Sequence, residues 1–446
     1  MPSDKAAAIS YLKFPFYLKK DQLEAVDAWI SNGLRGSIIY CSGTGKTEIA
    51  FECARKTAAA RAGISAITAF NILYLVPRIV LINQNYERLL KYGIPEESIG
   101  VYFGERKDVK EITISTYQSI INNLDLIRKS DMVIFDEVHL VSDTAKSFSK
   151  IFDVVVEDHG KAILGLTATI QDEDSRYNTI LTVLPSVKKY RIIDAIKDGR
   201  LVGPIVIPLK VKLTDKEQKI YDTCSTKIKN ISNRFKRYDV KAMSLLLKKG
   251  GFPSWMAKAW FLNIRKRKVL LSCAENKILA TVDLIVKKHP RQRVMVFSET
   301  LDSISKLRAK LQAEGIISKV IDSKINFTDR QNILSKWGRE FCPLLSVHTL
   351  EIGYDVPQVG IEVILATTSN MNQAIQRIGR VIRKYEGKDS ALIYVVYVSD
   401  TKDDNILEVV RKAIETTGKE IGDKERAAEV AGIITKEIIQ HPSKRR

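Results

Sequence analysis

The chain has 446 residues, and its 45% hydrophobic content is enough for the cores of two α/β domains of ordinary size plus an insertion. It carries 71 lysines and arginines against 52 acidic residues, and the resulting formal net charge of +19 is typical of a protein that binds a polyanion. No apolar run approaches the roughly 18 residues of a membrane helix, so no membrane association is expected. Residues 1–5 lack the apolar centre of a signal peptide, so an intracellular location, in the cytoplasm or at the nucleoid, is expected. The five cysteines form no Cys-x-x-Cys pair, which predicts reduced thiols and no zinc or iron–sulfur site.

The first informative segment is residues 41–47, a glycine-rich turn that ends in Lys-Thr. Residues 37–40 before it predict a strand and residues 48–55 after it predict a helix, which is the order of a P-loop. Lys46 would neutralise charge on the β- and γ-phosphates, while the Thr47 hydroxyl would bind Mg²⁺. The full P-loop pattern has glycine where this chain has Tyr40, and a turn that only caps a helix is the alternative. The predicted nucleotide-binding residues of this segment are Ser42, Gly43, Thr44, Gly45, Lys46 and Thr47.

A second segment, residues 133–139, predicts an apolar strand that ends in two adjacent carboxylates. Asp136 could hold the water shell of Mg²⁺, and Glu137 could accept the proton of the attacking water. Alone, this segment could equally be a strand that runs into an acidic turn. Together with the P-loop upstream, it predicts a site for ATP hydrolysis.

At this point the chain resembles the superfamily 2 helicases and translocases, because residues 136–139 match the Asp-Glu-x-His motif of that family. Further motifs of the family lie in the expected order along the chain, at residues 75–78, 114–117, 166–169, 294–298, 351–355 and 376–383. The resemblance implies that Gln22 reads the adenine and that Gly353 and Asp355 also belong to the nucleotide site. It further implies that DNA is contacted by Arg78, Ser115, Thr116 and Thr349.

The last of these motifs, residues 376–383, places two arginines three residues apart in an expected helix. Arg380 and Arg383 would then share a helix face and approach the same phosphate, with Gln376 beside them. An arginine that reaches the γ-phosphate from a second domain stabilises the charge of the transition state and makes hydrolysis depend on domain closure. A solvated basic helix face is the alternative for this segment.

The spacing of apolar segments predicts an α/β fold with two RecA-like parallel-sheet domains in tandem and a helical thumb-like insertion. The expected first domain is residues 1–200, and a linker strand with the basic insertion follows at 201–274. The expected second domain is residues 275–400, followed by a helical tail at 401–446.

Charge is concentrated in the expected insertion, where residues 215–270 hold fifteen lysines and arginines and four acidic residues. Basic side chains can bind DNA phosphates, and the expected phosphate contacts are Arg265, Lys266, Arg267 and Lys268. Four aromatic residues lie between the basic clusters at residues 233–238 and 264–268, namely Phe252, Trp255, Trp260 and Phe261. They could form the small core of the insertion or stack on bases.

Within superfamily 2 the chain resembles the XPB-type helicases, especially their compact archaeal form, through residues 22–29, 204–212 and 276–279. This resemblance implies an ATP- and Mg²⁺-dependent DNA helicase or translocase that acts on forked, bubble or single-stranded DNA in DNA repair or transcription-linked repair. It also implies a nuclease partner, for which residues 401–446 are the candidate docking element. An ATPase switch, an annealing factor or a branch-migration factor stays an alternative. A nuclease–helicase fusion is disfavoured, because no separate carboxylate–lysine constellation stands outside the motor motifs.

Overall fold

The computed structural model describes residues 7–64, 69–141, 146–158, 160–170, 177–322, 324–347, 359–366 and 371–415. The chain divides into two compact units, the first ending at Leu201 and the second beginning at Val202. Among the described residues, no helix is long and apolar enough to cross a membrane.

The first unit is built on a twisted sheet whose strands are β1 (Arg35–Tyr40), β2 (Ile72–Val76), β3 (Ile99–Phe103), β4 (Arg106–Lys107), β5 (Ile112–Thr116), β6 (Met132–Asp136), β7 (Ala162–Thr167) and β8 (Ser186–Tyr190). Their order is β4-β3-β5-β2-β6-β7-β1-β8, and all pairs are parallel except β3 with β4. The central strands β2 and β7 are buried along their whole length, as expected of a parallel sheet covered on both faces.

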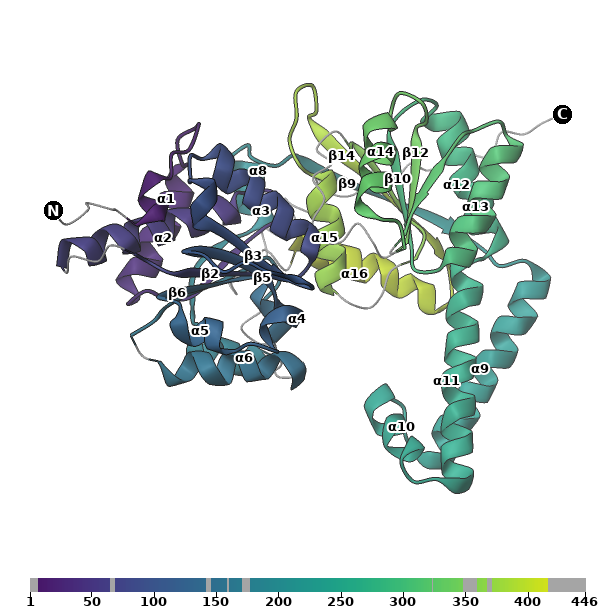
Figure 1. Cartoon of the computed structure of the whole chain (residues 1–446). Coiled ribbons are helices and arrows are strands. Elements are labelled where there is room, and N and C mark those ends of the chain that lie inside the picture. The colour runs from purple at the N-terminus through teal and green to yellow at the C-terminus, as the bar shows by residue number, and fades with distance from the viewer. Residues whose placement is uncertain are drawn as a thin grey trace. The chain divides into compact units, whose positions relative to one another are not determined.

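Helices cover both faces of this sheet (Figure 1). Those of one face are α1 (Lys20–Ser31), α2 (Lys46–Ile64) and α3 (Ile79–Lys91). Those of the other face are α4 (Tyr117–Ile120), α5 (Asp125–Lys129) and α6 (Lys146–Glu157), and the shorter α7 (Asn178–Val183) and α8 (Ile192–Lys197) flank β8 in the sequence. Apolar side chains of β6, including Val133 and Phe135, pack with Ile151 and Phe152 of α6 to form a core.

The second unit contains a sheet with strands β9 (Gly203–Val211), β10 (Val294–Ser298), β11 (Lys319–Ile321), β12 (Pro343–Val347), β13 (Ile361–Ile364) and β14 (Ser390–Val398). Their order is β11-β12-β10-β13-β14-β9, with parallel pairing throughout. The linker strand expected after residue 200 is β9, which pairs with β14 along its whole length and is the edge strand of the second sheet. An edge strand tolerates Pro204 and Pro208, because a proline there removes no hydrogen bond from the interior of the sheet.

The helices of the second unit are α9 (Asp215–Phe235), α10 (Val240–Leu247), α11 (Gly251–Ser272), α12 (Glu275–Asp283), α13 (Leu301–Ala313), α14 (Phe327–Lys336), α15 (Met371–Val381) and α16 (Asn405–Glu415). Of these, α12 and α13 lie on one face of the sheet, and α15 and α16 lie on the other (Figure 1). The predicted fold of two parallel-sheet α/β domains is confirmed.

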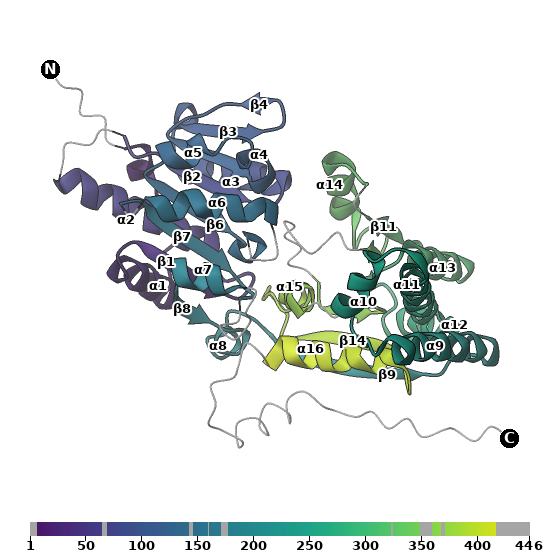
Figure 2. The ribbon, with the colours of Figure 1, turned by 90° about the horizontal axis from the view of Figure 1, so that it is seen from below.

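Helices α9 and α11 form a long hairpin with α10 at its far end (Figure 1), and Figure 2 shows the molecule from below. Thr214 caps α9, because its hydroxyl accepts from the Glu217 N–H while the Glu217 carboxylate accepts from the Thr214 N–H. Trp260 belongs to the core of the hairpin, and its indole N–H donates to the Ser232 hydroxyl at 2.9 Å. Phe252 and Trp255 are 49% and 63% exposed, so only part of the aromatic set forms this core.

Candidate nucleotide and nucleic-acid sites

Three adjacent strands of the first unit bring the predicted ATP-site motifs to one edge of the sheet. Strand β7 lies between β1 and β6, and all three run parallel. The carboxyl ends of parallel strands meet at the same edge, which is where ligands bind in open α/β sheets. The P-loop after β1, the carboxylates at the end of β6 and Thr167 at the end of β7 therefore lie together.

The P-loop has a backbone that depends on its glycines. Gly43 and Gly45 have φ angles of +83° and +86°, which side-chain-bearing residues rarely adopt. A Cβ atom on Gly45 would also lie 2.3 Å from Gln22 Nε2. Helix α2 begins at Lys46, so its first-turn amides and its dipole favour an anion at this end.

Two side chains of the P-loop bond to the strand before it. Lys46 Nζ donates to the Tyr40 carbonyl at 3.0 Å, and Thr44 Oγ1 donates to the Cys41 carbonyl at 2.7 Å. Tyr40, which replaces the glycine of the full pattern, is fully buried, and its hydroxyl donates to the Asp21 carbonyl at 2.8 Å. The departure at position 40 thus places an aromatic side chain in the core and leaves the carbonyl available to Lys46.

Gln22 is buried at the start of α1 and supports the P-loop directly. Its Nε2 donates to the Thr44 carbonyl at 3.2 Å and reaches the Gly45 carbonyl at 3.5 Å. Its Oε1 accepts from the Lys19 N–H at 2.8 Å. The structure therefore brings Gln22 to the nucleotide site, while its reading of adenine stays a prediction.

The two carboxylates at the end of β6 differ in their tendency to ionise. Burial and the neighbouring Glu137 charge raise the pKa of Asp136 to about 7, although Lys46 opposes this. Burial also disfavours ionisation of Glu137, but the contact with His139 and the charge of Lys46 outweigh it and lower the pKa of Glu137. At neutral pH, Glu137 is therefore the carboxylate that is ready to accept a proton.

The backbone and a buried histidine fix the position of Glu137. Its φ angle of +57° is in the left-handed region, at a cost of about 1–3 kcal/mol for a residue with a side chain. His139 Nδ1 lies 3.3 Å from Glu137 Oε2 and 3.0 Å from Thr167 Oγ1. The family motif at residues 166–169, at the end of β7, thus contacts the acidic motif through His139.

The donor set at this edge fits Mg²⁺. Among the described residues, no three His, Cys, Asp or Glu side chains gather as a metal cage. Thr47 and Asp136 instead offer two oxygen donors, and Mg²⁺ is usually bound by one or two protein oxygens together with substrate phosphates and water. These residues could therefore hold Mg²⁺ once a nucleotide is bound.

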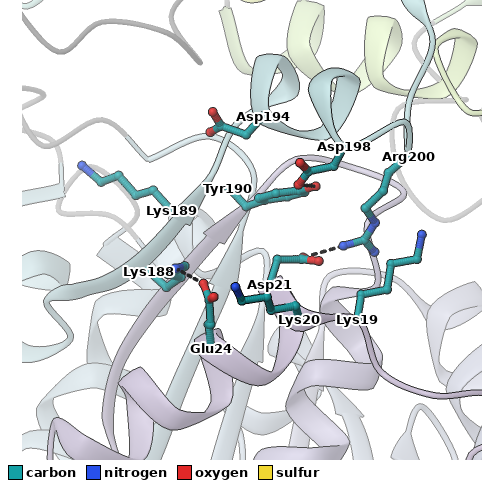
Figure 3. A pocket seen from close by; sticks show the side chains of 10 residues that line it. All are labelled: Lys19, Lys20, Asp21, Glu24, Lys188, Lys189, Tyr190, Asp194, Asp198 and Arg200. Carbon is teal, nitrogen blue, oxygen red and sulfur yellow. Dashed lines mark hydrogen bonds and ion pairs between the residues drawn. The ribbon is translucent and has the colours of Figure 1, made fainter.

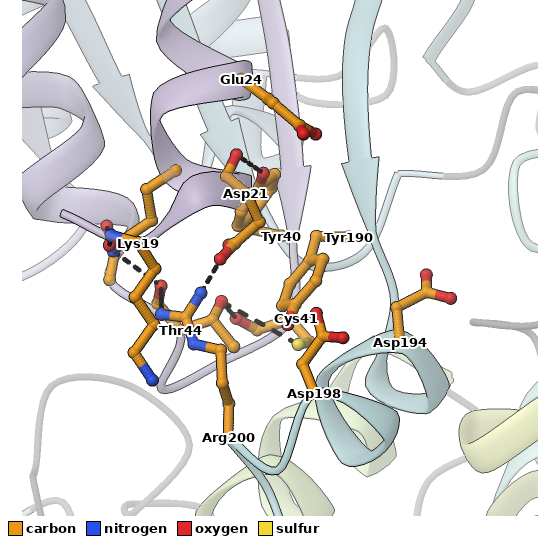
Figure 4. A network of polar contacts seen from close by, with 12 residues as sticks. Lys19, Asp21, Glu24, Tyr40, Cys41, Thr44, Tyr190, Asp194, Asp198 and Arg200 are labelled. Atoms are coloured by element: carbon orange, nitrogen blue, oxygen red, sulfur yellow. Dashed lines mark hydrogen bonds and ion pairs between the residues drawn. The ribbon is translucent and has the colours of Figure 1, made fainter.

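A polar pocket of about 490 Å³ lies beside the start of α1 (Figure 3). Its lining residues are Lys19, Lys20, Asp21, Glu24, Lys188, Lys189, Tyr190, Asp194, Asp198 and Arg200. Figure 4 shows the network that joins it to the P-loop, in which Arg200 Nη1 donates to Asp21 Oδ2 and Nη2 donates to the Thr44 carbonyl, both at 2.5 Å. The Tyr190 hydroxyl donates to Asp198 Oδ2 at 2.7 Å. The sequence reasoning missed Tyr190 and Arg200, because neither stands in a motif of recognisable spacing.

The predicted DNA contacts of the first unit lie at the ends of β2 and β5, which are neighbours in the sheet. Arg78 is exposed just before α3. Ser115 is buried, and its hydroxyl donates to the Tyr102 carbonyl at 2.7 Å. The Thr116 hydroxyl caps α4 by accepting from the Ser119 N–H at 3.2 Å. Of the three side chains, Arg78 is the one best exposed to meet a phosphate, and Thr349 lies outside the described residues.

In the second unit, Gln376 and Arg380 lie on α15 and are nearly buried. Helix α15 ends at Val381, so the prediction that Arg380 and Arg383 share a helix face is wrong. The Lys388 ammonium donates to the carbonyls of Val381 and Arg383, which binds the end of the helix. Arg383 therefore follows the helix, and Gly353 and Asp355 lie outside the described residues.

The arginine that precedes Arg380 by one helical turn is Arg377, which is almost fully buried with its guanidinium 5.5 Å from the ring centre of Phe297. Glu362 on β13 is fully buried. Burial raises the pKa of Glu362 to about 8, while the charges of Arg377 and Arg380 oppose this rise. The sequence reasoning missed both Arg377 and Glu362 as members of this charged cluster.

The four predicted phosphate contacts on α11 have different surroundings. Arg265 and Lys266 are exposed. Arg267 Nη1 donates to the Ser225 hydroxyl at 3.3 Å, and Lys268 forms an ion pair with the buried Glu299. Arg265 and Lys266 are therefore the members of this set best placed to meet a polyanion.

Two family models match the chain. The model described as "Type III restriction enzyme, res subunit" matches residues 16–172, and the model described as "Helicase conserved C-terminal domain" matches residues 276–385. The first match contains the P-loop and the paired carboxylates, and the second contains Gln376, Arg380 and Arg383.

The chain is similar to "DNA 3'-5' helicase XPB" of Mycobacterium tuberculosis, with 26% identity over 415 residues that cover 90% of this chain and 64% of the relative. It is also similar to "DNA 3'-5' translocase XPB2" of Sulfurisphaera tokodaii, with 25% identity over 394 residues that cover 86% of this chain and 83% of the relative. The chain therefore spans about 64% of the length of the mycobacterial relative.

Solved structures share the fold. The structure titled "ATP-dependent Type ISP restriction-modification enzyme LlaBIII bound to DNA" has a TM-score of 0.62 and 18% identity, and the match covers 91% of this chain and 30% of that chain. The structure titled "Crystal structure of Pyrococcus furiosus Hef helicase domain" has a TM-score of 0.57 and 16% identity, and the match covers 88% of this chain and 99% of that chain.

The chain has two parallel-sheet domains, with a P-loop and an Asp-Glu-x-His motif at one sheet edge. Together with the matches to the restriction-enzyme res-subunit model and the helicase C-terminal model, these features define a superfamily 2 helicase-type protein. Within this superfamily the chain is similar to proteins named XPB, at about 25% identity over most of its length. The predicted resemblance is confirmed.

Proposed function

We propose that the chain is an ATP-dependent DNA helicase or translocase that couples hydrolysis to movement along DNA. The observation that carries this proposal is the meeting of the P-loop with Asp136 and Glu137 at one sheet edge, where the two carboxylates have opposite pKa shifts. Relatives named as 3'-5' helicases and translocases support DNA as the track and a 3'-to-5' direction.

In this proposal the residues of the first unit carry the chemistry of hydrolysis. Lys46 exchanges the Tyr40 carbonyl for nucleotide phosphate oxygens, which are stronger partners for an ammonium group. Thr47 and Asp136 hold Mg²⁺, which neutralises phosphate charge when it is bound. Glu137 accepts the proton of the attacking water, and His139 and Thr167 keep its carboxylate in place.

The nucleoside part of ATP is proposed to enter the pocket beside Thr44. Its volume of about 490 Å³ is within the usual range for a small-molecule site. Gln22 follows Asp21, which lines this pocket, and its amide contacts the Thr44 carbonyl of the P-loop. This position supports its predicted role in reading adenine.

DNA is proposed to contact Arg78 in the first unit and Arg265 and Lys266 on the hairpin of the second unit. These side chains are exposed, and fixed phosphate contacts of this kind give affinity that weakens with salt. Roles in DNA repair or transcription-linked repair, and a nuclease partner, stay predictions from the resemblance. Of the candidate docking element at 401–446, residues 401–415 are described and include α16, and the remainder lies outside the described residues.

The direct test is strand displacement by the full chain. Duplexes with a 3′ tail, a 5′ tail, a fork or an internal bubble would be incubated with ATP and Mg²⁺, and ATP hydrolysis would be followed with and without each DNA. The expected result is DNA-stimulated hydrolysis with displacement on the 3′-tailed and forked substrates. Stimulated hydrolysis without any displacement would favour an ATPase switch or an annealing or branch-migration factor, and hydrolysis indifferent to every DNA would overturn the proposal.

A further inference from the structure

Arg200 links two elements of the nucleotide site that are far apart in the sequence. Its Nη1 donates to Asp21 Oδ2 at the start of α1, and its Nη2 donates to the Thr44 carbonyl in the P-loop. The side chain is only 9% exposed, and its guanidinium carbon lies 5.5 Å from the ring centre of Tyr190. Figure 4 shows the guanidinium between Asp21 and Thr44.

The Thr44 carbonyl is a shared acceptor. It receives the Arg200 guanidinium and also the Gln22 amide at 3.2 Å, while the Thr44 hydroxyl donates to the Cys41 carbonyl at 2.7 Å. Thr44 is fully buried, so its carbonyl has no water to replace a lost partner. A change in P-loop conformation that moves this carbonyl must therefore move Arg200 or break its hydrogen bond.

Hydrogen bonds to α8 also fix the backbone at Arg200. Its N–H donates to the Ala195 carbonyl of α8 at 2.8 Å, and the Leu201 N–H donates to the same carbonyl at 3.1 Å. The second unit begins at Val202, and β9 begins at Gly203. Arg200 is thus the side chain that joins the P-loop to the last residues of the first unit before the chain enters the second.

When phosphate binds, the Lys46 ammonium has to leave the Tyr40 carbonyl to contact it, so nucleotide occupancy changes the hydrogen bonds within the P-loop. We propose that Arg200 is a positioning residue that transmits nucleotide occupancy of the P-loop to the segment entering the second unit. This inference rests on the proposed ATPase function. A guanidinium suits this role because its planar fork donates to two acceptors in a fixed geometry, which the compact ammonium of a lysine on its flexible stem does not impose.

The test compares Arg200→Lys, which keeps the charge and loses the fork, with Arg128→Lys as a matched control. Arg128 also pairs with a nearby carboxylate, that of Asp125 at 2.8 Å, but this ion pair involves no P-loop atom. Basal and DNA-stimulated ATP hydrolysis would be measured in the full chain. In Arg200→Lys the stimulated rate is expected to fall by about tenfold more than the basal rate, a factor within the usual range of coupling between sites. Arg128→Lys is expected to keep the wild-type ratio.

Hydrogen exchange gives a second readout that needs no DNA. With a non-hydrolysable ATP analogue, the amides of residues 199–203 are expected to change their exchange in the wild type and to change less in Arg200→Lys. Equal losses of basal and stimulated rates, with a normal exchange response, would overturn the inference and leave Arg200 as a support of the P-loop alone. If wild-type hydrolysis ignored DNA while the exchange response still depended on Arg200, the proposed DNA function would fail and the coupling would stand.

Discussion

His139 Nδ1 lies 3.3 Å from Glu137 Oε2, and the same nitrogen lies 3.0 Å from Thr167 Oγ1. The histidine of the acidic motif thus connects the base to the strand that separates it from the P-loop strand. This contact is one cause of the lowered pKa of Glu137, so it bears directly on the protonation state of the proposed base.

Substitution of Glu137 by Gln should abolish turnover while ATP binding stays nearly intact, because the base is lost and the phosphate contacts are kept. A loss of about 10²- to 10⁴-fold in kcat is expected for a general base. Substitution of Lys46 by Ala should instead weaken binding itself, since the phosphates lose a counter-charge. Binding measured with a non-hydrolysable ATP analogue, beside steady-state hydrolysis, separates the two effects. Hydrolysis by Glu137→Gln at the wild-type rate would show that another group takes the proton.

Substitution of His139 by Ala should shift the acid limb of the pH–rate profile to higher pH. The contact with His139 lowers the pKa of Glu137, so its removal raises that pKa, and a larger share of the base is protonated at a given acidic pH. The pH dependence of kcat for the variant and the wild type, measured side by side, checks the direction of this shift. A profile with unchanged shape and a uniformly lower rate would mean that His139 serves packing only.

Substitution of Arg380 or Arg383 by Ala should depress hydrolysis with little change in the affinity for an ATP analogue. An arginine that stabilises the transition state during phosphoryl transfer is worth about 10³- to 10⁵-fold in kcat. Because Arg383 lies beyond the end of α15, the two variants need not be equal, and the larger loss identifies the arginine that meets phosphate. Arg339→Ala is a suitable control, since Arg339 is exposed in the same unit. Wild-type hydrolysis by both variants would exclude a catalytic role for the motif.

Substitution of Glu362 by Gln should change how stability depends on pH. Burial raises the folded-state pKa of Glu362 to about 8, above its ordinary value of 4.5, so the folded state binds more protons and wild-type stability falls as pH rises between these values. The glutamine variant lacks this titration, so its free energy of unfolding relative to the wild type should increase by up to about 1.4 kcal/mol per pH unit across that window. Denaturant unfolding at pH 5, 6, 7 and 8 measures this difference. A difference independent of pH would show that Glu362 is already ionised when folded.

Neutralising Arg265 and Lys266 together should flatten the salt dependence of DNA binding. Each phosphate contact that is lost reduces the slope of log K against log salt by about 0.9 on duplex DNA, so a change of up to roughly 2 is expected. Arg267 and Lys268 have partners within the second unit, so neutralising them should change the slope less. Binding to a forked duplex across a salt series gives both slopes. An unchanged slope in the Arg265/Lys266 variant would mean that other side chains make the main phosphate contacts, with Arg78 as the next candidate.

The ATP-site motifs could be predicted from the sequence because each stands at the end of one buried strand, and parallel strands bring such ends to one edge. The roles of Lys46, Asp136 and Glu137 could therefore be predicted without knowing which distant segments contact one another. Arg200 could not be found in this way, because its partners Asp21 and Thr44 are more than 150 residues away in the sequence.

Helix ends and sheet edges were the weaker predictions. The prediction that Arg380 and Arg383 share a helix face failed because α15 ends between them. The spacing of the arginines does not show that Lys388 binds the end of this helix. The membership of β9 in the second sheet was missed for a related reason, since its prolines argue against a central strand and only the fold shows that this strand is at the edge.

The most direct test of the central claim is movement along single-stranded DNA. Oligonucleotides carrying biotin at the 5′ end or at the 3′ end would be blocked with streptavidin, and displacement of streptavidin would be followed with ATP and Mg²⁺ for the wild type and Glu137→Gln. A 3'-to-5' motor driven by this site should displace streptavidin from the 5′ end, should act far more slowly at the 3′ end, and should lose both activities in the variant. DNA-stimulated hydrolysis with no displacement from either end would contradict the claim that this ATP site drives movement.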